Sequence, residues 1–277
     1  MLFLCLAILS SAAISLVMRL SADRVKARLS MLGVNYLVCA LLGAMYAGFD
    51  LLPKAEGLST AVLLGAVAGV LYLSGFVLFQ WNTANNGIVL SSIFMKLGLL
   101  VPMVLSIFLF REIPGMAQIV GFVLALGAIF LMNLQKDMAL TGSALLLISV
   151  MLLGGSGDAM SKVFEELGPG HLSQQFLMYT FASAFLLSLA VVAFKKQRFG
   201  KWDIFFGVLI GIPNFFSAKF LLGALTHLAA VIVYPTYSVA SLLVITLAGI
   251  FLFREKLTVR QWIGLGIILP ALALLNL

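Results

Sequence analysis

The segment Ile107-Phe108-Leu109-Phe110-Arg111-Glu112 occurs again, 143 residues further along the chain, as Ile250-Phe251-Leu252-Phe253-Arg254-Glu255. Each copy closes an apolar run with an arginine and a glutamate. The two copies stay in register downstream, where identical residues recur at the same offset: Gln118, Gly121, Ala128, Asn133 and Leu134 correspond to Gln261, Gly264, Ala271, Asn276 and Leu277. Self-similarity at a fixed period indicates an internal repeat. The sequence therefore predicts a chain built from two copies of one unit.

The composition indicates that these units lie in a membrane. Hydrophobic residues make up 63% of the 277 residues, charged residues make up 10%, and the mean hydropathy is +1.17. The apolar stretches reach the roughly 20 residues that a helix needs to cross about 30 Å of hydrocarbon. They lack the polar and apolar alternation of membrane β-barrels. We therefore predict an all-α, polytopic membrane protein.

Apolar runs bounded by charges, Pro, Gly and Asn predict ten transmembrane helices. In the first unit they cover Leu2 to Met18, Leu29 to Phe49, Leu58 to Phe79, Gly87 to Phe110 and Met116 to Leu134. In the second unit they cover Ser143 to Met160, Leu172 to Phe194, Trp202 to Leu222, Ala229 to Phe253 and Thr258 to Leu277. The predicted domains are two five-helix repeats, 1–134 and 143–277, joined by a linker at 135–142. Since five is odd, the second repeat enters the membrane from the opposite face, which makes the repeats inverted.

Most cations lie in short loops between apolar runs. We therefore interpret the net charge of +7 as orienting the helices in the membrane rather than as binding nucleic acid. Loops on one side carry twelve of the 17 Lys and Arg residues, whereas loops on the other side carry three. Under the positive-inside rule the rich side is cytoplasmic, so both termini are predicted to lie outside the cytoplasm. The expected location is the cell membrane, and the inner membrane in a Gram-negative cell.

Ten spans in two inverted halves, each with a glutamate ending its fourth helix, resemble the EamA-like branch of the drug/metabolite transporter superfamily. The resemblance covers essentially the whole chain. In that family a Leu-Thr pair, a Gln and a Gly follow the glutamate, and the second copy matches with Glu255, Leu257, Thr258, Gln261 and Gly264. The first copy keeps Glu112, Gln118 and Gly121 but has Ile113 and Pro114 in place of Leu-Thr.

Two features of the chain depart from the family pattern. Arg111 and Arg254 stand where the family usually has Gly, and the Pro usually found upstream of the glutamate is displaced. Family members also often keep both termini in the cytoplasm, contrary to the charge distribution, and we follow the charges. The resemblance implies a carrier that works by alternating access, driven by a gradient or a counter-substrate rather than by ATP. The sequence also lacks a Walker-type phosphate loop.

Lys96 is the candidate substrate or coupling residue that the sequence supports best. It sits near the middle of a predicted span, where charges normally face a bundle interior or a water-filled cavity. Ser92 lies one turn earlier on the same face. The competing interpretation is that Lys96 pairs with a distant carboxylate or is neutral. Lys219, nearer the end of its span, can also extend its ammonium to the interface; if both lysines line the cavity, anions are the favoured substrates.

Other polar and aromatic residues within spans complete the predicted substrate-binding set. These are Asn35, Tyr36, Tyr72, Gln175, Tyr179, Asn214, Tyr234, Tyr237 and Ser241. Each tyrosine can instead be an interfacial anchor. Arg111, Glu112, Arg254 and Glu255 are assigned a structural role because they are duplicated at the membrane boundary.

The leading functional hypothesis is a secondary transporter for a small polar or anionic metabolite, with a cavity between the two repeats. The alternatives are an exporter or flippase of cationic drugs or lipid-linked sugars, and a non-transporting membrane scaffold. An enzyme is not expected, because convergent acid/base groups at membrane depth are missing. Neither a cofactor nor a metal is expected, since His227 has no second ligand. The expected partners are a small-molecule substrate, the bilayer, and a coupling proton or counter-substrate, in a monomer or homodimer.

Overall fold

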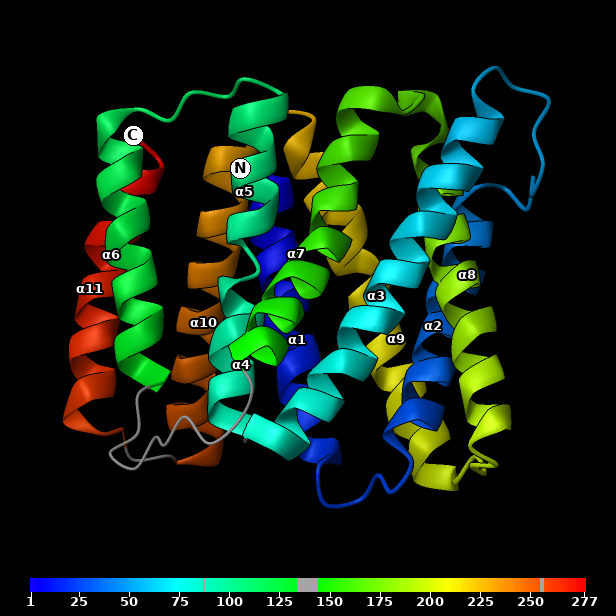
Figure 1. Ribbon diagram of the computed structural model, residues 1–277, viewed down its shortest axis with the longest axis horizontal. Coiled ribbons are helices and arrows are strands. Elements are labelled where there is room, and N and C mark those ends of the chain that lie inside the picture. The colour runs from blue at the N-terminus through cyan, green and yellow to red at the C-terminus, as the bar shows by residue number, and fades with distance from the viewer. Residues whose placement is uncertain (87, 134–143, 255–256) are drawn as a thin grey trace. The chain divides into compact units, whose positions relative to one another are not determined.

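The computed structural model describes residues 1–86, 88–133, 144–254 and 257–277, and those residues form an all-helical fold (Figure 1). The predicted fold class is therefore confirmed. The predicted linker 135–142 and Glu255 lie outside the described residues. The elements are α1 (Leu2–Ser21), α2 (Arg28–Tyr46), α3 (Leu58–Asn86), α4 (Ile88–Leu97), α5 (Leu100–Leu109), α6 (Met116–Asn133), α7 (Ala144–Leu167), η1 (Gly170–Leu172), α8 (Ser173–Phe194), α9 (Lys201–Leu225), α10 (Ala230–Phe253) and α11 (Val259–Leu275).

Helices stand at all ten predicted spans. Eight segments of the described chain are long and apolar enough to cross a membrane: α1, α2, α3, Ser91–Leu109, α7, Gly170–Phe194, α9 and α10. The fifth and tenth predicted spans correspond to shorter apolar helices, over Met116–Met132 and Val259–Leu275. Many large apolar side chains point outward, including Phe108 at 79% exposure and Phe251 at 78%, as expected for a surface that lipid covers. The chain is a multi-pass membrane protein.

The fourth predicted span differs from expectation, because two helices, α4 and α5, replace one. The interruption lies at Gly98, where an added Cβ would stand 3.0 Å from the backbone nitrogen of Gly155 and 3.1 Å from the carbonyl of Met151, both on α7. The break also places Pro102 in the first turn of α5. A proline is tolerated there because first-turn N–H groups have no partner within the helix. Apolar periodicity alone gave no signal of this break.

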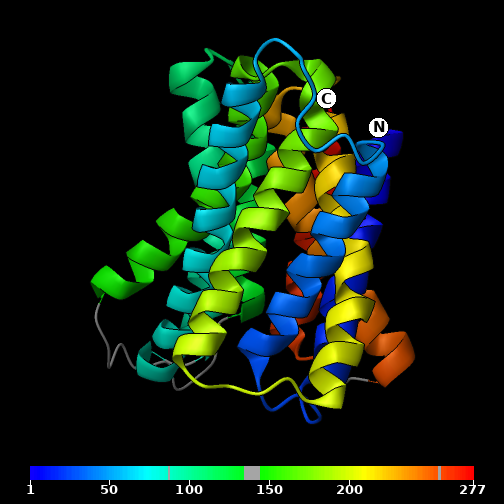
Figure 2. The same cartoon turned by 90° about the vertical axis from the view of Figure 1, so that its right-hand side faces the viewer.

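Contacts between Cα atoms divide the chain into two compact units, each built from both sequence halves. Unit 1 comprises Met1–Leu73 and Met160–Thr226, and unit 2 comprises Ser74–Ala159 and His227–Leu277. In unit 1, α2 packs against α8 and α9, and α1 packs against α9 (Figure 2). In unit 2, α6 packs against α11, and α10 packs against α5, α6 and α11.

Three of the helix pairs within the units join counterparts in the sequence repeat, whereas α9 is not the counterpart of α1 or of α2. Helices α2 and α8 are the second spans of the two repeats, α5 and α10 belong to the fourth spans, and α6 and α11 are the fifth spans. In these three pairs equivalent elements contact each other, which is the arrangement expected of repeats that a pseudo-two-fold axis relates.

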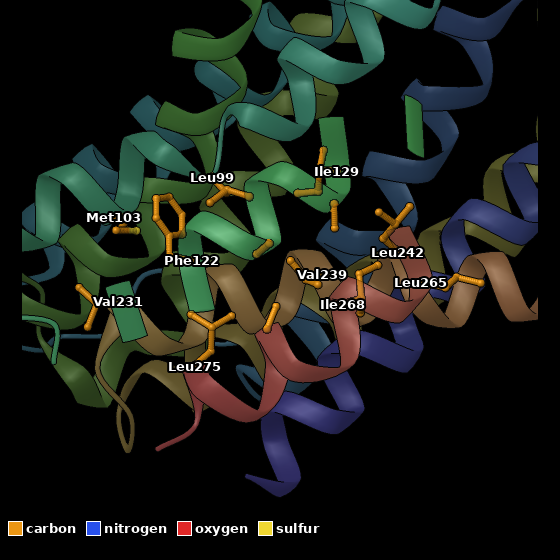
Figure 3. Packing of buried hydrophobic residues seen from close by; sticks show 13 residues of the cluster. Leu99, Met103, Phe122, Ile129, Val231, Val239, Leu242, Leu265, Ile268 and Leu275 are labelled. Atoms are coloured by element: carbon orange, nitrogen blue, oxygen red, sulfur yellow. The ribbon is translucent and has the colours of Figure 1, made fainter. Parts of the chain in front are cut away.

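The glycines of the repeated motif explain how α6 and α11 come close together. A Cβ at Gly121 of α6 would stand 2.9 Å from both the Ala271 carbonyl and the Leu275 nitrogen of α11. Because lipid tails are as apolar as protein side chains, membrane helices associate through such close backbone approach rather than through hydrophobic burial. Around this contact, Phe122, Ile129 and Ile268 form part of the core of unit 2 (Figure 3).

Candidate functional site

In unit 1, a polar contact lies where α2 crosses α9. Asn214 Nδ2 donates to Asn35 Oδ1 at 3.1 Å, and the Cys39 thiol donates to the carbonyl oxygen of Gly211 at 3.2 Å. Gly211 allows this close crossing, because a Cβ there would lie 2.9 Å from the Asn35 carbonyl. Pro213, inside α9, removes one helical N–H donor from the same region. Two predicted site residues, 179 positions apart, therefore come into direct contact.

Tyr36 and Tyr72, both predicted site residues, meet around a third ring. The centroid of Phe181, on α8, lies 6.4 Å from the ring centroids of Tyr36 and of Tyr72, both in stacked orientations. Phe215, one residue after Asn214, lies 6.4 Å from Phe181 as well. The aromatic rings and the asparagine pair are therefore linked along α9, where Asn214 and Phe215 are consecutive residues. Amide, hydroxyl and ring surfaces can together bind a polar organic solute by hydrogen bonding and stacking.

Tyr179 and Lys219 contact other parts of unit 1, and Gln175 is buried. The Tyr179 hydroxyl donates to the carbonyl oxygen of Leu51, in the segment after α2. Gln175, on α8, is 9% exposed. The Lys219 ammonium sits 3.1 Å from the ring centroid of Tyr46, at the end of α2, where it makes a cation–π contact.

In unit 2, Lys96 lies in the last turn of α4, immediately before the break at Gly98. Its side chain is partly buried, and Ser92 stands one helical turn earlier on the same helix. Within the described residues, no carboxylate lies within 4 Å of the Lys96 ammonium. The distant-carboxylate interpretation finds no partner in that part of the chain. Lys96 therefore places a cationic donor at a helix interruption inside an apolar span.

The predicted residues of α10 lie on one stretch of that helix. The Tyr234 hydroxyl donates to the carbonyl oxygen of Asp158, on α7, at 2.8 Å. Ser241 is 5% exposed, and its hydroxyl has no hydrogen-bond partner within the described residues. Tyr237, between them, is partly buried. A buried hydroxyl without a hydrogen-bond partner destabilises the folded state. The Ser241 hydroxyl therefore favours binding of a polar group from outside the described chain.

The repeated motif makes backbone contacts at the helix ends. The Glu112 N–H donates to the Ser106 carbonyl at 3.1 Å, while its carboxylate accepts the N–H of Val231, in the first turn of α10, at 3.0 Å. A carboxylate at a helix N-terminus is favourable because it satisfies a free N–H and complements the helix dipole. Glu112 thus joins the end of α5 to the start of α10.

Some contacts carried no clear sequence signal. Cys39 lies in an apolar run of the sequence, yet its thiol bridges α2 to α9. Phe181 is one of 22 phenylalanines, and nothing in its sequence context marks it as the ring that Tyr36 and Tyr72 share. The described residues contain no group of three His, Cys, Asp or Glu side chains placed to hold a metal. The predicted site residues of the two units carry amides, hydroxyls, aromatic rings and ammonium groups, which can bind a solute noncovalently.

Comparison with known proteins gives a family match and two relatives. Residues 140–277 match the family model described as the EamA-like transporter family. An uncharacterized protein of Haemophilus influenzae is 23% identical over 210 residues, which cover 74% of this chain and 72% of that protein. A probable 4-amino-4-deoxy-L-arabinose-phosphoundecaprenol flippase subunit, ArnE, of Hamiltonella defensa is 42% identical over 43 residues, which cover 16% of this chain and 38% of that protein.

The fold also matches a protein of known crystal structure. The similarity has a TM-score of 0.76, extends over 99% of this chain and 94% of the other, and comes with 15% sequence identity. At that identity the similarity describes the fold alone. The chain therefore shares its fold with a protein whose crystal structure is known.

Proposed function

Because residues 140–277 belong to the EamA-like transporter family, we propose that this protein is a secondary active transporter, which moves a small polar or anionic organic metabolite across the membrane by alternating access and without ATP. The family is one of transporters rather than enzymes. The groups in both units fit that activity, since they bind by hydrogen bonds, ring stacking and charge. A proton or a counter-substrate supplies the driving force.

The position of Lys96 is the observation that supports an anionic substrate. A charge within a membrane span is costly unless it serves a pathway or a site. Lys96 lies just before the break between α4 and α5, and no carboxylate among the described residues forms an ion pair with it. Interrupted helices are typical of the substrate and ion sites of secondary transporters. We assign to Lys96 the role of binding the negative charge of the substrate.

The test is uptake by purified protein in liposomes. Radiolabelled lactate, succinate and glucose 6-phosphate are offered under an imposed proton gradient and under counter-substrate exchange. Wild-type protein is expected to take up at least one of them. Lys96→Gln is expected to lower that uptake by about tenfold or more, the loss typical of a charge-assisted hydrogen bond, while Lys96→Arg retains more of it.

Lys54→Gln provides the matched control, because it removes one exposed cation from a loop of unit 1. Its uptake is expected to equal that of the wild type. Unchanged transport by Lys96→Gln would remove Lys96 from the site. Failure of every solute to move under any gradient would reject the transporter assignment itself.

A second candidate function is flipping of a lipid-linked sugar. It is favoured by the match to the probable ArnE flippase subunit, although that match covers only 43 residues. The aromatic rings around Phe181 would suit the sugar. Liposomes containing a fluorescent undecaprenyl phosphate sugar distinguish the candidates: a flippase exposes the fluorophore to dithionite from outside, whereas the solute transporter leaves the inner-leaflet fraction protected.

A further inference from the structure

One end of unit 1 carries most of that unit's positive charge. The turn between α1 and α2 contributes three cations and the turn between α8 and α9 contributes four: Arg24, Lys26, Arg28, Lys195, Lys196, Arg198 and Lys201. All seven are exposed. The two turns meet, since the Ala27 N–H donates to Asp203 Oδ1 at 3.5 Å (Figure 2). We call this surface the basic end.

Acidic residues do not neutralise the basic end. Asp203 is only 3% exposed, and its other oxygen, Oδ2, accepts the Gly200 N–H at 2.9 Å. Both oxygens of the Asp203 carboxylate therefore accept backbone N–H groups, close to the start of α9. Asp23 is the one exposed acid in the two turns. Within the described chain, none of the seven cations forms an ion pair. The surface keeps a strong positive potential.

Two of these cations contact the same indole ring. Arg24 Cζ lies 5.1 Å from the ring centroid of Trp202, and Lys201 Nζ lies 5.8 Å from it. The ring attracts each cation, but the two like charges also repel each other. An anion bound beside Trp202 would relieve that repulsion. A phosphate fits best, because guanidinium groups bind its oxygens in a bidentate geometry.

Apolar side chains accompany the cations and indicate where the anion comes from. Phe194 is 89% exposed, Leu20 is 52% exposed and Phe199 is 42% exposed. Leu20 and Phe194 lie in the last turns of the membrane-spanning helices α1 and α8, and Phe199 lies in the turn before α9. Tryptophan and cations at such ends lie at the level of the lipid headgroups. A soluble acidic partner would leave these apolar groups in water, whereas a phospholipid covers them with its acyl chains.

We propose that the basic end of unit 1 is a binding site for anionic phospholipids, with the lipid phosphate held by Arg24 and Lys201 beside Trp202. The remaining cations attract the charged lipid surface. The site shares no residue with the proposed solute-binding set and does not depend on the proposed transport activity. It would give the protein a preference for phosphatidylglycerol over a zwitterionic lipid of the same chain length.

The first test is lipid retention, measured by native mass spectrometry of the purified protein with equal amounts of phosphatidylglycerol and phosphatidylcholine. Wild-type protein is expected to retain phosphatidylglycerol preferentially. A variant with Arg24→Gln, Lys26→Gln, Arg198→Gln and Lys201→Gln is expected to lose about tenfold or more of that preference, because each cation near the lipid surface contributes severalfold. A control removes the same charge elsewhere, with Lys54→Gln, Arg111→Gln, Arg254→Gln and Arg260→Gln, and keeps the preference.

Equal loss in both variants would mean that net charge alone sets the preference, and would overturn the proposal. So would an unchanged preference in the site variant, which is also the result expected if the basic end instead binds an acidic soluble protein.

A second measurement places the lipid at Trp202 and does not require the fourfold variant to fold. The chain has three tryptophans, so Trp81→Phe with Trp262→Phe leaves Trp202 as the sole tryptophan, which is excited selectively over tyrosine. In mixed bilayers, brominated phosphatidylglycerol is expected to quench Trp202 more strongly than brominated phosphatidylcholine at the same mole fraction. Adding Lys201→Gln should reduce the difference by about twofold or more. Equal quenching by the two lipids in the parent protein contradicts the site.

Discussion

At the scale of single residues, Arg111 and Arg254 adopt the same unusual backbone conformation. Their φ angles are +55° and +53°, in the left-handed region, and they stand at equivalent positions of the repeat. A residue with a Cβ pays about 1–2 kcal/mol there, which glycine avoids. The family that the sequence resembles usually has glycine at both positions. Both arginine side chains are exposed.

Replacing Arg254 by glycine is therefore expected to stabilise the protein by about 1 kcal/mol, since it removes the left-handed strain. Arg254→Val should instead destabilise it, because a β-branched side chain fits that conformation worst. Thermal unfolding in detergent measures both. Arg260→Gly, at an exposed position in the first turn of α11, serves as the control and should bring no gain. Equal midpoints for the glycine and valine variants would show that the backbone at Arg254 is not under strain.

At the scale of elements, the break between α4 and α5 depends on contact with α7. A Cβ at Gly155 would stand 2.8 Å from the Gly98 carbonyl carbon and 2.8 Å from Val101 Cβ. Neither atom belongs to the end of a flexible side chain, so the helices would have to separate. Gly75 of α3 also approaches α7, because a Cβ there would lie 3.3 Å from Gly154. Helix α7 thus contacts its neighbours through paired glycines.

Gly155→Ala is expected to lower stability by about 1–3 kcal/mol, the usual cost of overpacking a tight contact. Gly127→Ala, in α6, provides a matched control, because nothing lies within 4 Å of a Cβ placed there. That change should be neutral or stabilising. Thermal unfolding of the two variants in the same detergent compares them. If both alanines shift the midpoint equally, the glycine contact does not hold the break in place.

Sequence patterns predicted the elements well because apolar length and repeat offset report directly on membrane spans. They missed the break at Gly98, since the apolar run continues across it. They also nominated Asn35 and Asn214 separately but could not pair them, because a contact over 179 residues depends on tertiary packing. The third predicted span ended at Phe79, whereas α3 continues to Asn86, because polar residues such as Asn82 are buried there.

At the scale of the whole molecule, the two sequence repeats and the two compact units divide the chain at different residues. The two repeats divide the chain in sequence, but each compact unit takes helices from both. No local pattern predicts this interleaving, because it arises from tertiary contacts between helices of the first repeat and helices of the second, such as α1 with α9 and α2 with α8. The basic turns of unit 1 lie at one end of that unit, as the ten-span topology requires of loops on one side.

The charge distribution predicts that both termini lie outside the cytoplasm. A cysteine added at either end of a protein with Cys5→Ala and Cys39→Ala should react with a membrane-impermeant maleimide in intact cells. A cysteine introduced at Lys26→Cys should react only after permeabilisation. Protection of both termini in intact cells would reverse the proposed orientation.

We propose that the chain carries an organic anion across the membrane without ATP, through a site that contains Lys96. Counterflow tests it most directly: liposomes loaded with unlabelled anion are diluted into a trace of the labelled anion, with no ATP present. With wild-type protein we expect the label to accumulate transiently above its equilibrium level, and we expect Lys96→Gln to abolish this overshoot. Absence of an overshoot with every anion tested, or an undiminished overshoot in Lys96→Gln, would contradict it.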